Sequence, residues 1–305
     1  EFGFASSGGL AAWDSVMRTE DRGANTPVVR WHDKTRKGYD KYLYYIGLHF
    51  PDPQSLEDLV YYSQLNQAEA LKCGIEHWRR QKGRCWGTLF WQLNDCWPVQ
   101  SWAVIDSTLT PKAAYWWLRK IYAPVLVSLV REGDKVVAHV TSDLLEAIQG
   151  DVTINIETFD GDILKSETYE AYVPENSSVE IGAIDVSGIK AHFRDVYVYV
   201  TFTPLWEIGQ KEINNFMFLA EPKDLRLQDP GIQLEVTVNS FRSQNVRITA
   251  KRFAPYFWII GDSANGKRWH INQSDNFFHL RAGEEKRIKI STDNSEHKDI
   301  KFRTL

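Results

Sequence analysis

The stretch Gly87–Trp102, GTLFWQLNDCWPVQSW, decides the fold predicted for this chain, because it begins apolar and ends polar and aromatic. Side chains alternate along a strand, so Leu89 and Trp91 point to one side and Phe90 to the other. The apolar start is typical of a strand that is covered on both faces, so we predict a buried core strand there. The polar end then falls at the strand's carboxyl end, where α/β barrels carry their chemistry.

The side chains at the end of this strand suit a sugar, which presents apolar C–H faces and hydroxyl edges. They are Trp91, Gln92, Asn94, Asp95 and Trp97. The pattern alone fits a second interpretation equally well: a tryptophan-rich core strand closed by a capped turn, since buried aromatic rings usually mean packing.

Length and composition further limit the possible number of domains and the classes of function. With 305 residues the chain can form two or three domains. A formal net charge of -4 argues against a dedicated nucleic-acid binder, and no apolar run is long enough for a membrane helix. The three cysteines lack histidines at zinc-finger spacing, so we predict no metal site, no cofactor and no disulfide scaffold. Reduced cysteines favour the cytoplasm only weakly, and localisation stays open.

Two helices flank the opening strand. The segment Ser55–Lys82 has apolar residues at spacings near 3.6, with Ser55 as its cap and Gly83 as its stop. A second helix is predicted to start at Thr110, with a proline in its first turn, and to end before Pro124. Strand end, helix, strand, helix is the order of the closing units of a βα barrel, whose other strands would have to precede Glu1.

Two basic stretches each allow two interpretations. Residues 79–82 complement the dipole at the end of the first helix, which explains them better than phosphate binding does. The run Arg30–Lys37 is a solvated surface by default. The alternative is a loop over the site, in which Trp31 and His32 touch substrate.

From Val125 onward the apolar period is two, which predicts strands separated by turns and therefore β-sandwiches. The predicted strands are 125–130, 135–140, 151–156, 195–201, 233–238, 246–250 and 287–290. The chain changes character near Pro124, because nine of its 12 tryptophans precede residue 123. A linker is predicted at Glu221–Asp224.

Several motifs resemble the C-terminal part of the β-mannosidases of glycoside hydrolase family 2. They are EFGF at 1–4, WQLNDCWP at 91–98, SWA at 101–103, NNFMFL at 214–219 with PKDL at 222–225, and DNFFHL at 275–280 with Gly283-Glu284. The resemblance implies a multidomain α/β plus all-β chain. Residues 1–123 would be the C-terminal part of a (β/α)8 TIM barrel, and 124–222 and 223–305 would be two immunoglobulin-like β-sandwiches.

The same resemblance implies a retaining glycosidase, which needs one carboxyl group as nucleophile and another as general acid/base. It assigns the nucleophile to Glu1, which would otherwise be taken for a solvated chain end. Trp91 would line the sugar subsite, with Asn94, Asp95 and Trp97 as its neighbours. The acid/base glutamate belongs to an Asn-Glu motif that this sequence does not contain. We therefore expect the chain alone to be inactive.

The implied activity is that of an exo-acting β-mannosidase, which releases mannose from a β-mannoside oligosaccharide or glycan. The expected partner is the missing N-terminal part of the same enzyme; nucleic acid and membrane are not expected. One alternative keeps the class but changes the sugar or the mode, to a β-glucosaminide, a β-galactoside or endo action. Another is a carbohydrate-binding module without catalysis.

Overall fold

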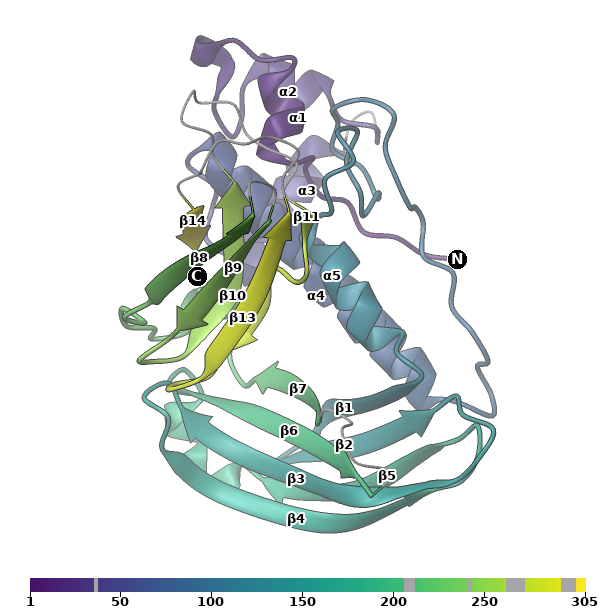
Figure 1. The fold of residues 1–305 in the computed structure, drawn as a ribbon. Helices are drawn as coiled ribbons and strands as arrows, with labels where there is room; N and C mark the ends of the chain where they lie inside the picture. Colours follow the sequence, from purple (N-terminus) through teal and green to yellow (C-terminus); the bar gives the residue numbers. More distant parts are fainter. Residues whose placement is uncertain (36–37, 206–211, 241–242, 262–271, 292–299) are drawn as a thin grey trace. The chain divides into compact units, whose positions relative to one another are not determined.

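The computed structural model describes residues 1–35, 38–205, 212–240, 243–261, 272–291 and 300–305 (Figure 1). The α-helices there are α1 Leu10–Asp14, α2 Pro27–Trp31, α3 Tyr39–His49, α4 Leu56–Arg80 and α5 Ala113–Ile121. Short 3-10 helices are η1 Thr19–Asp21, η2 Ser187–His192 and η3 Pro222–Asp224. The strands are β1 Val125–Glu132, β2 Lys135–Ser142, β3 Ile148–Thr158, β4 Ile163–Val173, β5 Ser178–Asp185, β6 Val196–Pro204, β7 Ile213–Phe218, β8 Gln233–Ser240, β9 Ser243–Thr249, β10 Ala254–Gly261, β11 Asn272–Gln273, β12 Phe278–Leu280, β13 Glu285–Ser291 and β14 Ile300–Arg303.

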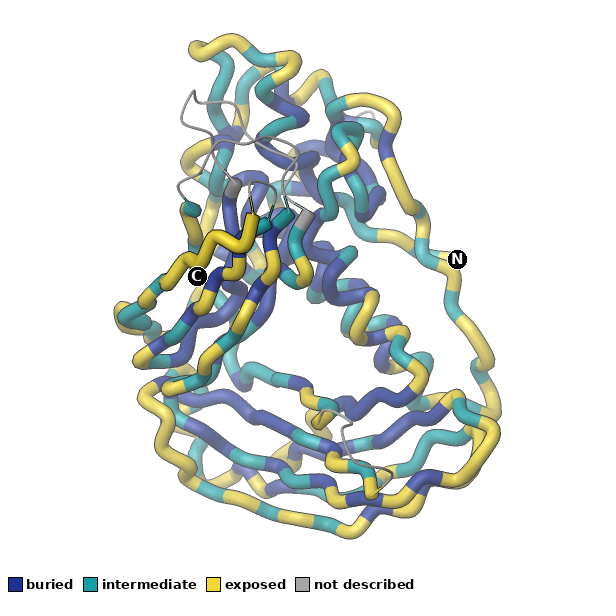
Figure 2. The backbone as a smooth tube through the Cα atoms, viewed as in Figure 1, coloured by how far each residue is buried: buried dark blue, intermediate teal, exposed yellow. Residues whose placement is uncertain are grey.

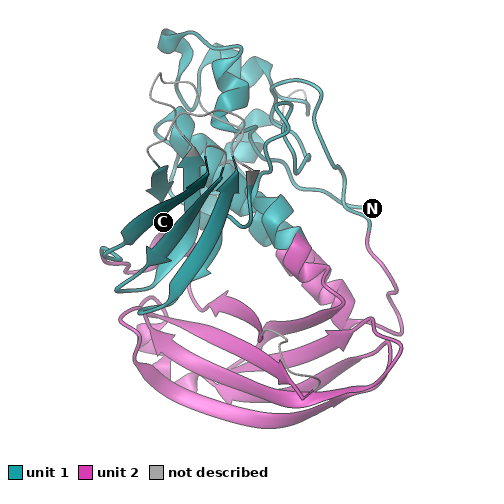
Figure 3. Cartoon of the chain, in the orientation of Figure 1, with its two compact units in different colours: residues 1–71, 89–118, 229–305 teal, residues 72–88, 119–228 magenta. Residues whose placement is uncertain are grey.

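The chain forms two compact units (Figure 3). The first contains Glu1–Leu71, Leu89–Leu118 and Asp229–Leu305, so it joins the N-terminal helices to the last β region. The second contains Lys72–Thr88 and Arg119–Gln228. The domain boundaries at 123/124 and 222/223 remain a prediction.

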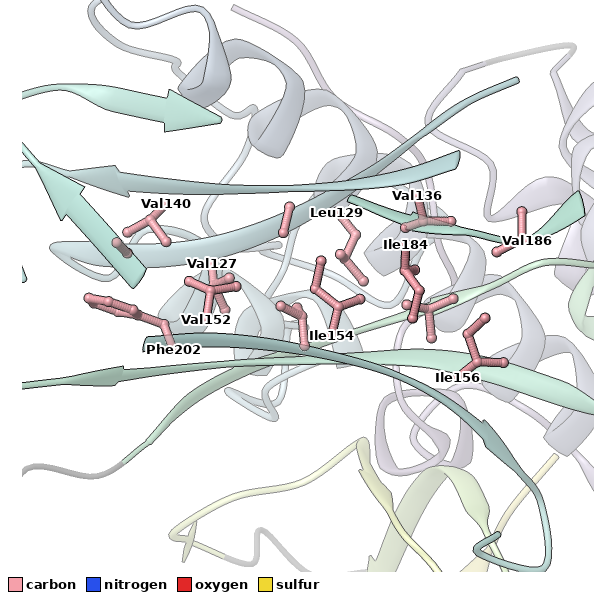
Figure 4. Packing of buried hydrophobic residues seen from close by; sticks show 14 of the residues in the cluster. Val127, Leu129, Val136, Val140, Val152, Ile154, Ile156, Ile184, Val186 and Phe202 are labelled. Carbon is pink, nitrogen blue, oxygen red and sulfur yellow. The ribbon is translucent and has the colours of Figure 1, made fainter. Parts of the chain in front are cut away.

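The second unit holds an antiparallel sandwich of a β1-β2-β5 sheet and a β4-β3-β6-β7 sheet. Alternate side chains of the two sheets meet in one apolar core, as two-residue periodicity requires (Figure 4). The core includes Val127, Leu129, Val136, Val140, Val152, Ile154, Ile156, Ile184 and Phe202. Each such side chain, once buried, stabilises the fold by roughly 1.5–3 kcal/mol.

The first unit holds a second sandwich, with sheet orders β11-β13-β9-β8 and β12-β10-β14. Its core includes Val246, Ile248, Phe257, Ile259, Phe278, Leu280, Ile288 and Ile290. All seven predicted strands are confirmed, with each end within three residues of the predicted one. Strands β4, β5, β7 and β10 lie where no strand was predicted.

Helix α4 confirms the clearest helix prediction. The Ser55 hydroxyl accepts the Asp58 amide at 3.1 Å, and the Asp58 carboxylate accepts the Ser55 amide at 3.0 Å, which together form a capping box. Gly83 has a φ of +100°, the conformation that ends helices and favours glycine. The predicted apolar face is buried except at Trp78, which is half-buried. In Figure 2 most of α4 is dark blue.

The basic end of α4 has a role that neither interpretation named. Arg79 donates to the carbonyl oxygens of Ile121 and Ala123 at 2.6 and 2.8 Å. Lys82 donates to the carbonyl oxygen of Ser142 at 3.0 Å and also pairs with Asp143. Within the second unit, these cations therefore fasten the helix end to the start of the sandwich.

Two predictions about the opening region are wrong. Residues 87–90 form no buried strand: Leu89 is 72% exposed, and Phe90 makes only an isolated parallel bridge to Phe2. A strand becomes core only when neighbours cover it on both sides, and the described residues supply one neighbour. Across 1–123, the part that the structure describes has helices and isolated bridges but no multi-residue strand ladder.

The second correction concerns α5, which begins at Ala113 rather than at a Thr110 cap. The Thr110 amide donates to the Asp106 carboxylate at 3.0 Å, so Thr110 belongs to a turn centred on Asp106. The Ala113 amide is instead satisfied by the Gln64 side chain at 3.1 Å. A tertiary contact thus replaces the local cap that the sequence predicted.

Candidate active site

The first residues of the chain run parallel to the stretch that precedes the aromatic loop. The Phe2 amide donates to the Leu89 carbonyl oxygen at 3.0 Å, and the Trp91 amide donates to the Phe2 carbonyl oxygen at 2.7 Å. Phe2 and Phe90 are therefore the paired residues. Because side chains alternate along each strand, this register puts Glu1 and Trp91 on the same face of the pair.

This face is open in the described part of the chain. Glu1 is exposed, and its carboxylate makes no hydrogen bond or ion pair with any described residue. Trp91 is 51% exposed, and the peptide bond that joins it to Gln92 is cis. Asn94 is exposed as well, and near the N label in Figure 2 the tube is mostly yellow and teal. A carboxylate, an amide and an aromatic ring are thus accessible together.

One face of α4 holds the two segments in place through buried polar side chains. Gln67 donates to the carbonyl oxygens of Phe4 at 2.8 Å and of Trp102 at 3.0 Å, and it accepts the Ser6 hydroxyl at 2.7 Å. Ser63 accepts the Ser7 amide at 3.0 Å. Since irregular backbone has no ladder to satisfy its polar groups, these side chains supply the missing partners.

Trp97 lies against His32, with ring centroids 4.8 Å apart and an interplanar angle of 34°. The His32 ring also contacts the carbonyl oxygen of Pro98 through Nδ1, and its centroid lies 5.6 Å from that of the buried Trp13 ring. Trp97 remains 37% exposed. The structure therefore places His32 against Trp97, and the hypothesis that His32 touches substrate stays a prediction.

The same hypothesis placed Trp31 in a loop over the site. Residues Pro27–Trp31 form the short helix α2 rather than a loop, and Thr26 caps it. Trp31 is 81% exposed. Arg36 and Lys37, at the end of the basic run, lie outside the described residues.

Asp95 is not the open polar neighbour that the sequence predicted. It is 4% exposed and accepts the Ser101 hydroxyl at 2.6 Å. Lys112, fully buried at the start of α5, has its Nζ 3.6 Å from Asp95 Oδ2. Burial lowers the pKa of Lys112, while the Asp95 and Asp106 carboxylates act to raise it. The aspartate is thus part of a buried ion pair behind the open face.

Sequence reasoning missed Gln67, Lys112 and Ser6 as contributors to the site. Their spacing gives no signal, because each acts on backbone that only the tertiary fold brings near. In the described part of the chain no three histidine, cysteine or acidic residues are grouped so as to hold a metal ion. Nor does any described helix combine the length and apolarity needed to cross a membrane.

Comparisons with known proteins show what the chain is similar to, beginning with its two β regions. Residues 134–224 match the family model of the mannosidase Ig/CBM-like domain, and residues 227–305 match a mannosidase Ig-fold domain. Beta-mannosidase B of Aspergillus fumigatus is 27% identical over 310 residues, covering 95% of this chain and 36% of that protein. Beta-mannosidase B of Aspergillus clavatus is 26% identical over 325 residues, covering all of this chain and 37% of that protein.

Solved structures share the fold. The β-D-mannosidase of Dictyoglomus thermophilum superposes with a TM-score of 0.84 at 24% identity, over 99% of this chain and 36% of that one. The exo-chitosanase CsxA of Amycolatopsis orientalis superposes with a TM-score of 0.74 at 16% identity, over 99% of this chain and 40% of that one.

By its two sandwiches and their family matches, the chain is similar to glycosidases that carry immunoglobulin-like domains. Within that class, the chain corresponds to the C-terminal portion of the β-mannosidases of glycoside hydrolase family 2. It spans 36–37% of the length of the curated relatives described above.

Proposed function

We propose that this chain contributes the nucleophile side of a retaining exo-β-mannosidase, whose substrate is a terminal β-mannoside of an oligosaccharide or glycan. The Glu1 carboxylate attacks the anomeric carbon, and the bond to the leaving oxygen breaks as that oxygen takes a proton from a second carboxyl group. Water then releases the sugar from Glu1 after giving its proton to that second group. Trp91, Asn94 and Trp97 contact the sugar.

The observation that carries this proposal is the register of Phe2 with Phe90, which puts Glu1 on the face of Trp91. A pure binding surface has no need of a carboxylate there. The bridge between Phe2 and Phe90 is parallel, which is the direction that neighbouring strands of the proposed barrel would have.

The second carboxyl group is proposed to come from the remaining part of the same enzyme. Exposed apolar side chains of the first unit support this, since Leu89 and Leu93 are 72% and 57% exposed. The 305-residue chain by itself should not turn over an aryl β-mannoside. Turnover by this chain at the complete enzyme's rate would refute that part of the proposal.

The test is steady-state hydrolysis of aryl glycosides by the complete enzyme with Glu1→Gln. Loss of the nucleophile should lower kcat by at least about 10³-fold with β-mannoside. The matched control is Glu20→Gln, an exposed acid of the same N-terminal segment, which should leave kcat unchanged. A panel with β-glucosaminide and β-galactoside tests the choice of sugar, and unchanged turnover by Glu1→Gln would sink the nucleophile assignment.

A second candidate function is carbohydrate binding without catalysis, which the Ig/CBM-like description of residues 134–224 favours. The same variant separates the two candidates. A binding module would retain its affinity for mannooligosaccharide in Glu1→Gln, and the wild type would show no glycoside hydrolysis.

A further inference from the structure

The Asp95 carboxylate lies at the centre of a buried set of contacts that no sugar can reach. Its side chain is 1% exposed, and Ser101 donates to Oδ2 at 2.6 Å. Oδ1 accepts no hydrogen bond from the described residues. The Nζ atom of Lys34 lies 3.8 Å from Oδ1. Burying a carboxylate costs free energy unless cations and donors replace the lost water, and Ser101, Lys112 and Lys34 supply these contacts.

The first arm of this set reaches the segment that follows Glu1. Lys112 Nζ lies 3.6 Å from Asp95 Oδ2 and donates to the Ser6 carbonyl oxygen at 3.4 Å. Ser6 and Ser101 exchange backbone hydrogen bonds at 2.8 and 3.0 Å. Asp95, Lys112, Ser6 and Ser101 therefore close a ring of contacts between the aromatic loop and the N-terminal segment.

The second arm reaches the segment that carries His32. The Lys34 amide donates to the Gln100 carbonyl oxygen at 3.2 Å, and the Gln100 amide donates to the His32 carbonyl oxygen at 2.8 Å. The Lys34 side chain then returns to Asp95 Oδ1. Because the His32 ring packs on Trp97, this arm fixes the ring behind the exposed tryptophan face.

We propose that Asp95 is a positioning residue, which ties the Trp97 loop to the Ser6 segment through Lys112 and to the His32 segment through Lys34. The inference rests on the proposed function, because it concerns how the sugar-binding wall is held. Asp95 acts through Trp97 and does not itself contact the sugar. Losing the Lys34 arm frees His32 and Trp97 while the Glu1 segment keeps its own arm.

The experiment measures KM and kcat of the complete enzyme with an aryl β-mannoside. Lys34→Gln removes the charge of a side chain that is about one third exposed, so the variant should still fold. KM should rise about threefold to tenfold, while kcat stays within about twofold of the wild-type value. The reason is that the variant loses binding that stabilises the bound substrate and the transition state equally. Lys34→Arg should restore the wild-type KM.

Asp95→Asn removes the charge from both arms while an amide oxygen still accepts the Ser101 hydroxyl. The double variant with Lys34→Gln should then have the KM of Asp95→Asn alone, since the two residues act through one contact. If the KM increases of the two single variants multiply in the double variant, the proposal is overturned. An unchanged KM in Lys34→Gln would overturn it as well. If Asp95→Asn does not fold, the Lys34 pair of variants still decides.

The control for a general loss of stability is Glu157→Gln. Glu157 is also a buried acid, 1% exposed, and it accepts the Tyr197 hydroxyl at 2.6 Å in the sandwich of the second unit. The Glu157→Gln variant should have a lower free energy of unfolding but an unchanged KM.

If the wild-type enzyme cleaves no β-mannoside, the proposed function is refuted. Hydrogen exchange of backbone amides in the 305-residue chain then tests the positioning role of Asp95 by itself. Lys34→Gln should speed exchange at the Gln100 amide; unchanged exchange there would overturn the inference.

Discussion

Gly3 has no room for a side chain beside Trp91: a Cβ built on Gly3 would lie 2.3 Å from the Trp91 carbonyl oxygen. It would also lie 3.2 Å from the Cβ atom of Trp102. Backbone atoms cannot rotate away as a flexible side chain can, so the close approach requires glycine. This glycine fixes how near the segment of Glu1 lies to the segment of Trp91.

Gly3→Ala should therefore push the two segments apart. Overpacking of this kind costs about 1–3 kcal/mol, and urea unfolding of the 305-residue chain should show a loss of that size. Gly87→Ala is the matched control, because a Cβ at Gly87 meets nothing within 4 Å. Equal stability of the two variants would contradict the close approach.

Gln67 should be indispensable for the N-terminal segment. Gln67→Met keeps the size of the side chain but removes the donor to the part-buried carbonyl oxygen of Phe4, while the Trp102 carbonyl oxygen keeps the Gln92 amide. An unsatisfied buried group costs about 1–3 kcal/mol, so the free energy of unfolding should fall by at least that amount. Gln81→Met, at an exposed position, should change it by less than about 0.5 kcal/mol. Similar values for both would argue against the role of Gln67.

The end of α4 is held in the second unit by a buried amide and carboxylate. Asn215 donates to Glu76 at 2.7 Å and to the Val127 carbonyl oxygen at 2.9 Å, and Glu76 is 3% exposed. Asn215→Ala should destabilise the chain by about 2–3 kcal/mol, since a hydrogen bond to a charged group is lost. The exposed neighbour Asn214 provides the control, and Asn214→Ala should be nearly neutral. Thermal unfolding checks both.

Asp58 should make stability depend on pH. Burial raises the pKa of Asp58, but hydrogen bonds from Arg303 and Ser55 outweigh it and hold the pKa below its ordinary value of 3.8. A depressed pKa in the folded state gives stability that is present above the unfolded pKa and is lost as pH falls through the folded value. Asp58→Asn should lower the free energy of unfolding by about 1–2 kcal/mol at pH 7.

The difference between wild type and Asp58→Asn should then shrink as pH falls below about 4. Urea unfolding from pH 7 to pH 3 measures it. Glu175→Gln, an exposed acid with no recorded partner among the described residues, should show no such trend. A gap that stays constant with pH would contradict the assignment.

Periodicity predicted the parts of the fold that local sequence controls. Helix α4 and the seven strands follow from spacings of 3.6 and 2, and Ser55 and Gly83 mark the helix ends as predicted. Helix α3 was missed although Tyr39, Tyr42 and Ile46 are buried at helical spacing, because aromatic residues and Gly47 are weak helix formers. Strand β4 was missed although its burial alternates, since Lys165 and Glu167 lie at its less exposed positions and interrupt the apolar period of two.

The surroundings of the site could not be predicted in the same way. Whether Asp95 faces substrate or core depends on Lys112 and Ser101, which only the tertiary fold brings to it. The motif resemblance identified Glu1 and Trp91, and their shared face follows from a register that no single segment encodes. Pairing between segments almost 90 residues apart is a property of the fold as a whole.

The most direct test of the central claim is covalent labelling of the complete enzyme with a 2-deoxy-2-fluoro-β-mannosyl fluoride. The fluorine at the second carbon slows the second step, so a glycosyl-enzyme accumulates if the mechanism is retaining. Peptide mass spectrometry should find the fluoromannosyl group on the Glu1 carboxylate, in the peptide that contains Phe2 and Gly3. A label on any other carboxylate, or turnover of the reagent with no label at all, would contradict the account.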